Sequence, residues 1–209
     1  MYSREQLREK ASKAKDKRGA IGPDVDLTKF DETPVTHSYM EDEDLCSIPK
    51  EEQNRLIMAG LDVTKRERGG TYFQKDTEVV HCHMPQEGID VIPIRKALEH
   101  HDWIKDYYWN LVEVDADKYT AAAELGLHDG YVIRSHPGST SVYPVQACLY
   151  LDKDGIQQNV HNIIIAEEDS ELHIITGCAT SPHLKTGVHV GVSEFYVKKN
   201  AKLTFTMIH

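Results

Sequence analysis

The spacing of hydrophobic and polar residues changes about halfway along the chain. Residues 3–18 are rich in Glu, Lys, Arg, Gln and Ala, and Ser3 and Gln6 stand at the two positions of a capping box, which predicts a helix. Residues 47–60 (SIPKEEQNRLIMAG) predict a short helix that Gly60 ends, and residues 92–112 predict two more. Between them, RERGGTYFQKDTEVVHCHMP predicts a pair of strands, with Gly69-Gly70 as the turn signal.

From Gly130 onward, short β-type segments alternate with brief polar connectors. A shift of 31 positions places IIIAEEDSELHIIT (163–176) over EFYVKKNAKLTFTM (194–207), with apolar residues on apolar residues. Similarity at a fixed period is typical of stacked units that bury each other's faces. The pattern favours a parallel β-helix, and an antiparallel sandwich or barrel is the alternative. We expect an N-terminal α/β domain over 1–115 and a mainly β part over 116–209.

Composition narrows the range of partners. The net charge of −10 and the isoelectric point near 5.6 argue against nucleic acid or an anionic membrane as the main partner, because such surfaces attract basic proteins. No apolar stretch reaches membrane-spanning length, and the charged N-terminus does not resemble a signal peptide, so we expect a cytoplasmic protein. The four cysteines, Cys46, Cys82, Cys148 and Cys178, are far apart in the sequence and form no CxxC motif. We therefore expect them to be free thiols and not disulfides.

Two stretches carry candidate chemistry. In HCHMPQE (81–87), a strand would place His81 and His83 on one face, and with Glu87 they resemble the first motif of the cupins, which bind metals. The alternative is that both imidazoles face solvent, and the chain has no second cupin motif. Cys178 follows Gly177 at a predicted strand end, where a corner position would let a partner reach the thiol. The alternative for Cys178 is a small buried hydrophobic residue.

Seven segments, in order, resemble the SufB/SufD family, particularly its archaeal SufB-like form: RERGGTYFQKD, HDWIKDYYW, DKYTAAAE, GYVIRSHPG, YPVQACLY, QNVHNIIIAEEDSELHIITGCAT and GVHVGVSEFYVKKNAKLTFTMIH. The resemblance implies an α+β N-terminal domain followed by the first coils of a right-handed parallel β-helix. It implies a scaffold component of the SUF iron–sulfur cluster assembly system, with no turnover chemistry of its own. The implied partners are a SufC-type ABC ATPase, a SufB/SufD-type paralogue or second copy, and a sulfur donor protein.

The resemblance also assigns residues. Cys178, in the Gly-Cys that ends ELHIITGC, matches the position that receives sulfur as a persulfide, and His189 matches a histidine of the next strand that has no firm role. The family's cluster ligands and SufC-binding helices fall beyond His209, so the resemblance covers the family's N-terminal half. We therefore expect an iron–sulfur cluster in the complete complex and none on this chain alone. The alternatives are a cupin-like metal enzyme using His81, His83 and Glu87, or a structural SufD-like subunit in which Cys178 only packs.

Overall fold

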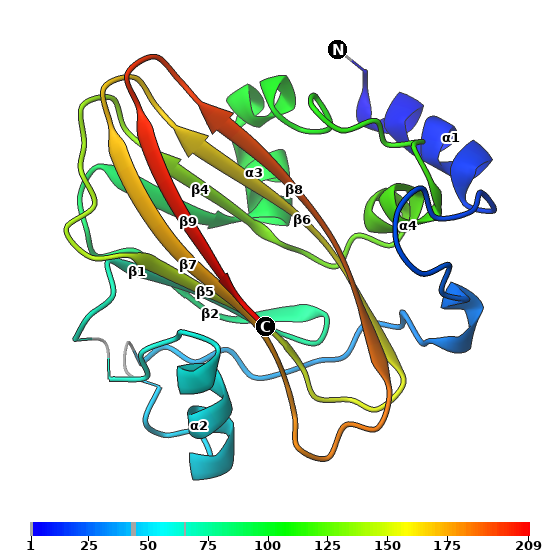
Figure 1. The fold of residues 1–209 in the computed structure, drawn as a ribbon, viewed down its shortest axis with the longest axis horizontal. Helices are drawn as coiled ribbons and strands as arrows, with labels where there is room; N and C mark the ends of the chain where they lie inside the picture. The colour runs from blue at the N-terminus through cyan, green and yellow to red at the C-terminus, as the bar shows by residue number, and fades with distance from the viewer. Residues whose placement is uncertain (1, 43–44, 65) are drawn as a thin grey trace.

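Two β-sheets lie face to face, and helices cover their outer sides (Figure 1). The computed structural model describes residues 2–42, 45–64 and 66–209. In this part of the chain, one sheet has the order β2-β1-β5-β7-β9 and the other β3-β4-β6-β8. The strands are β1 Gly70–Lys75, β2 Glu78–His83, β3 Ile89–Pro93, β4 Tyr131–Ser135, β5 Val145–Leu151, β6 Ile156–Ala166, β7 Glu171–Thr180, β8 Gly187–Val197 and β9 Lys202–Ile208. The helices are α1 Arg4–Ala14, α2 Lys50–Met58, α3 Ile94–His100 and α4 Lys118–Leu125, with 3₁₀ turns η1 Leu27–Lys29 and η2 Asp102–Asp106.

From β4 onward, successive strands alternate between the two sheets, and each lies parallel to the strand after next. β6 pairs with β8 and β7 with β9 in the register of the sequence repeat, so that Ile163 lies beside Glu194 and Leu172 beside Leu203. This parallel pairing contradicts the antiparallel sandwich or barrel considered from the sequence. The right-handed parallel β-helix stays a prediction; from β4 onward, parallel strands alternate between the two mixed sheets, which is the strand order that such a coil requires.

Strands from the first half of the chain extend both sheets. β1 lies parallel to β5, β2 pairs antiparallel with β1, and β3 pairs antiparallel with β4. Hydrogen-bonded strand pairs therefore join the parts of the chain on either side of residue 115. The domain division at that position stays a prediction. No helix in the described ranges is both long enough and apolar enough to cross a membrane.

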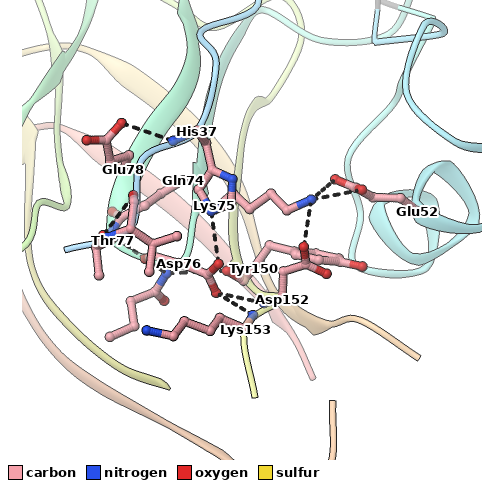
Figure 2. A network of polar contacts seen from close by, with 12 residues as sticks. His37, Glu52, Gln74, Lys75, Asp76, Thr77, Glu78, Tyr150, Asp152 and Lys153 are labelled. Carbon is pink, nitrogen blue, oxygen red and sulfur yellow. Dashed lines mark hydrogen bonds and ion pairs between the residues drawn. The ribbon is translucent and has the colours of Figure 1, made fainter. Parts of the chain in front are cut away.

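The turn between β1 and β2 lies at Asp76 and Thr77, not at Gly69-Gly70, so the predicted turn position was wrong. Asp76 adopts a left-handed conformation (φ 48°), which aspartate tolerates better than most residues. Its carboxylate accepts the backbone N–H groups of Asp152 and Lys153, at 2.7 and 3.1 Å, and contacts His37 Nε2 at 2.9 Å (Figure 2). These bonds join the hairpin to the corner after β5, a contact distant in sequence.

A second ion network ties α2 to the same corner. Lys75 Nζ lies 3.1 Å from Glu52 of α2 and 3.1 Å from Asp152, and both pairs are visible in Figure 2. The side chains of Lys75 and Glu52 are largely buried, so solvent screens their pair less than it screens a surface pair. The network therefore helps to hold α2 in place over its sheet.

Three hydrophobic clusters form the core. One lies between the two sheets and includes Tyr72 of β1, Ile133 of β4 and Leu172 of β7. A second packs α1 and α4 on the outer face of β4, β6 and β8. A third packs α2 on the outer face of β1 and β5. The predicted capping box of α1 is confirmed, because the Ser3 and Gln6 side chains each accept the other residue's backbone N–H.

The aromatic segment that follows η2 is anchored on a buried carboxylate. Glu194 of β8 accepts four consecutive backbone N–H groups, from residues 109–112, at 2.6 to 3.1 Å. It also contacts His161 of β6, with Oε2 2.9 Å from Nε2. Trp109 adopts a positive φ of 53°, which turns the backbone so that these N–H groups converge on one side chain. The aromatic segment is therefore tied to the sheet by polar contacts as well as by packing.

Candidate functional site

Cys178 lies inside strand β7, and its side chain is half-buried. Backbone pairing with β5 continues past it, from Cys178 beside Leu149 to Thr180 beside Leu151. The expected corner position is therefore wrong by two residues, because the parallel partner extends the strand beyond the Gly-Cys step. The thiol packs against the cluster between the sheets, on the opposite face of the strand from Gly177.

A cavity of about 410 Å³ opens beside Cys178. Its walls come from the end of α2 and from the last residues of the chain, and they include Arg55, Met58, Ala59, Ile208 and His209. Gly177 allows α2 to approach this closely, since a Cβ at residue 177 would clash with the backbone carbonyl of Ala59. The Gly-Cys pair thus has two roles in this geometry: the glycine admits α2, and the cysteine lines the cavity.

Burial sets the protonation of the thiol. Removal from water raises the pKa of Cys178 above its ordinary value, since a thiolate loses more solvation than a thiol. Complete burial raises the pKa of the neighbouring Cys148 still more strongly. Both cysteines are free thiols. Because the thiolate is the nucleophile, Cys178 is mainly in its unreactive protonated form at neutral pH.

His189 lies on β8, in the other sheet. Its Nδ1 is 2.8 Å from Oε1 of Gln158, and the amide nitrogen of Gln158 donates to the backbone carbonyl of Asp76. Burial, with a smaller contribution from His209, lowers the pKa of His189 to about 4. The ring is therefore neutral at pH 7. No hydrogen bond between His189 and Cys178 is found among the described residues, so the structure does not bring the two together as a bonded pair.

The HCHMPQE stretch does not converge on a common point. His81 is buried, and its Nδ1 lies 2.9 Å from the carbonyl oxygen of Met40, while the rings of His81 and His83 are 6.4 Å apart. Glu87 is exposed in the loop after β2. Across residues 2–42, 45–64 and 66–209, no group of three or more His, Cys, Asp or Glu side chains is placed to hold a metal ion. The geometry therefore gives the cupin-like hypothesis no support.

Sequence reasoning missed Arg55, His209 and Gln158. Nothing in the local sequence marks Arg55 or His209, because they reach the cavity only through the packing of α2 and β9 on β7. Gln158 did carry a signal: it stands 31 positions before His189, the offset of the internal repeat, and the two residues pair directly across β6 and β8.

Comparison with known proteins defines the class. Residues 149–209 match the family model described as SUF system FeS cluster assembly, SufBD core domain. This segment contains both Cys178 and His189 and covers β6 to β9.

Curated relatives extend the similarity to nearly the whole chain. An iron–sulfur cluster assembly SufBD family protein of Methanothermobacter thermautotrophicus is 46% identical over 207 residues, covering 96% of this chain and 50% of the relative. A SufBD family protein of Archaeoglobus fulgidus is 48% identical over 158 residues, covering 76% of this chain and 42% of the relative. The iron–sulfur cluster assembly protein SufB of Bacillus subtilis is 23% identical over 195 residues, covering 90% of this chain and 42% of the relative.

The chain belongs to the SufBD family. It spans about half the length of the Methanothermobacter relatives.

Proposed function

We propose that this chain is a scaffold component of SUF iron–sulfur cluster assembly and that Cys178 accepts sulfur as a persulfide. The observation that carries the proposal is the position of Cys178: it lines a cavity of about 410 Å³ within the segment that matches the SufBD core domain. Cys178 is one of the residues that line this cavity, and the packing of its side chain against the cluster between the sheets would shield a persulfide from bulk solvent.

The proposed step is a sulfur transfer between thiols. The Cys178 thiolate attacks the outer sulfur of a donor persulfide, a new S–S bond forms at Sγ, and the donor's S–S bond breaks. The donor leaves as a thiolate and takes up the proton that Cys178 lost, so no net oxidation occurs. Because burial raises the pKa of Cys178, the step requires a base or a partner that favours the thiolate. His209 and Arg55 line the same cavity and are the candidate side chains for this role.

The wider proposal follows the family. The partners we propose are a SufC-type ATPase, a SufB/SufD-type paralogue or second copy, and a sulfur donor, with the iron–sulfur cluster as the cargo of the complete complex. We propose that the chain performs no turnover chemistry of its own. A right-handed parallel β-helix suits this role, because a ladder of paired strands holds a side chain in a rigid position.

Persulfide mapping tests the assignment of Cys178. The chain is incubated with a persulfide donor and reductant, alkylated, digested and analysed by mass spectrometry. We expect persulfide on Cys178, its loss in Cys178→Ser, and its retention in the control Cys46→Ser, which removes an exposed cysteine elsewhere. Persulfide spread evenly over the four cysteines, or absent from Cys178, would contradict the assignment.

An activity assay separates this proposal from the structural SufD-like alternative. Cys178→Ser is assembled into the SUF complex, and cluster formation is followed by absorbance. A large loss of cluster formation with the complex intact supports sulfur acceptance. Unchanged cluster formation would mean that Cys178 only packs against the core between the sheets.

A further inference from the structure

A second cavity, of about 460 Å³, lies away from Cys178, at the open side of the β2–β3 region. This volume falls within the range typical of small-molecule sites. Its walls come from four parts of the chain that are distant in sequence: Tyr39, strand β2, the β3–α3 junction and Asp129. None of them lines the Cys178 cavity.

One wall carries a buried carboxyl group. Asp129 is 9% exposed, and its Oδ1 accepts the backbone N–H of Arg95 at 3.3 Å. Burial raises the pKa of Asp129 to about 7, against the smaller opposing effect of the Arg95 hydrogen bond and the nearby cations. A carboxylate held this far from water gains most from a cationic ligand group that restores its hydrogen bonds.

Two cationic residues, Arg95 and Lys96, line the same cavity, and Glu78 adds a second carboxylate to its lining. Arg95 and Lys96 lie at the start of α3, and both residues are exposed. Neither makes an ion pair with Asp129 within 4.0 Å among the described residues. An acidic group at the rim and an amine at the bottom would therefore each meet a partner of opposite charge.

Part of the remaining wall is apolar, and Thr77, Glu78 and Tyr39 supply its polar groups. Val79, Val91, Ile92 and Pro93 line it together with Cys82. The Cys82 thiol lies 3.6 Å from the carbonyl oxygen of Val91, and burial raises its pKa to about 12. Cys82 therefore contributes packing surface to this cavity and no nucleophile.

We propose that this cavity binds a small zwitterion of the aliphatic α-amino acid class. The ligand's ammonium group contacts Asp129, its carboxylate contacts Arg95 and Lys96, and its side chain packs on the apolar wall. The site is independent of sulfur acceptance at Cys178, so the two proposals fail separately.

The competing explanation is that Asp129 only supports the start of α3. The residue before the helix, Pro93, makes no side-chain cap, and the Asp129 bond to the Arg95 N–H partly fills that place. A purely supporting aspartate predicts no ligand binding, whereas the proposed site predicts that both charges of the ligand are needed.

Calorimetric titration tests the proposal with a matched set of probes. L-leucine carries both charges, 4-methylpentanoate lacks the amine, and 3-methylbutylamine lacks the carboxylate. At about pH 8, where Asp129 is largely ionised, we expect L-leucine to bind at least about tenfold more tightly than either truncated probe. Titrations of L-methionine and L-cysteine under the same conditions report how strongly the apolar wall discriminates between amino-acid side chains.

Variants assign the two ends of the site. Asp129→Asn should weaken the binding of L-leucine at least about tenfold and leave the binding of 4-methylpentanoate unchanged. The double variant Arg95→Gln/Lys96→Gln changes only exposed side chains. It should weaken the binding of L-leucine and leave the binding of 3-methylbutylamine unchanged. The controls are Asp90→Asn, on β3 but not among the residues that line the cavity, and Lys202→Gln on β9; both variants should bind L-leucine as the parent chain does.

Three results would overturn the proposal: no binding of any of the three amino acids at about 10 mM, equal binding of L-leucine and its truncated analogues, or binding that survives both sets of variants. Should Asp129→Asn fail to fold, the double variant alone still decides, since its side chains lie at the rim.

Discussion

Glu194 shows how much a single buried side chain organises in this chain. Glu194 and His161 have no exposed side-chain surface, and the carboxylate also receives the four N–H groups of residues 109–112. Burial alone would disfavour the charge, yet the hydrogen bonds from His161 and the backbone hold the pKa of Glu194 below its ordinary value. The cost of burying the charge is therefore offset by bonds that only this fold supplies.

Glu194→Gln is expected to lower the free energy of unfolding by about 3 kcal/mol or more, because it removes the charge from a buried hydrogen-bonded pair and places an NH₂ group against backbone donors. Urea denaturation monitored by tryptophan fluorescence measures this change in the free energy of unfolding. The matched control is Glu171→Gln, whose ion pair with Lys202 is exposed and should change stability by less than about 0.5 kcal/mol. Equal effects of the two substitutions would contradict the role assigned to Glu194.

His189 predicts a pH dependence of stability. Its folded-state pKa, about 4, lies below the ordinary value of 6.5, so the folded chain resists protonation that the unfolded chain accepts. The contribution of His189 is therefore fully present above about pH 6.5 and is lost as the pH falls toward 4. His189→Gln should make the decline in stability over this range shallower, by on the order of 1 kcal/mol once the partial exposure of the ring is considered. Denaturation profiles that run parallel for the two proteins across this pH range would contradict the assignment.

At the scale of elements, polar pairs repeat along the sheets at the same offset as the strands. Lys198 contacts Glu167, Asn200 contacts Asp169 and Lys202 contacts Glu171, each 31 positions apart. The EEDS and KKNA connectors thus lie side by side, acidic against basic. Pairs such as Lys202–Glu171 are exposed and weak singly, whereas Glu167 is buried; together the three pairs oppose a slip of the strand register.

Gly177→Ala tests the contact between α2 and β7. The added Cβ would meet the backbone carbonyl of Ala59, which cannot rotate away, so α2 must shift. We expect a loss of about 1–3 kcal/mol and faster alkylation of Cys178, because its cavity is walled by the end of α2. Gly187→Ala is the control, since the nearest atoms to its Cβ would be flexible leucine side chains at 3.2 and 3.3 Å. An unchanged alkylation rate in Gly177→Ala would contradict the proposed wall.

At the scale of the whole molecule, burial is uneven across the strands. Every residue of β6 is buried, between β4 and β8, whereas β9 lies at the end of its sheet and has no buried residue. The stability of local structure follows such differences in packing.

Native-state hydrogen exchange should reveal this gradient. Amides of β6 are expected to exchange only through global unfolding, and those of β9 at least about tenfold faster through local opening. Exchange measured by mass spectrometry on peptides from each strand checks this, with β5, also fully buried, as the internal control. Equal protection of β6 and β9 would show that the two sheets open only as a single unit.

The sequence by itself determined the local elements and the register of the repeat. Ser3 and Gln6 specified the start of α1, Gly60 followed the end of α2, and the 31-residue offset matched the pairing of β6 with β8 and β7 with β9. These features depend on residues close in sequence or on a regular period, so a linear pattern contains them.

Only the tertiary structure decided the sites. Cys178 lies within a strand because β5 continues beside it, and its cavity exists because α2 packs against Gly177. Asp129 faces Arg95 only because β3 pairs with β4 and brings the start of α3 beside it. Burial and charge at these positions depend on neighbours that are distant in sequence, and no local pattern records which distant segments will meet.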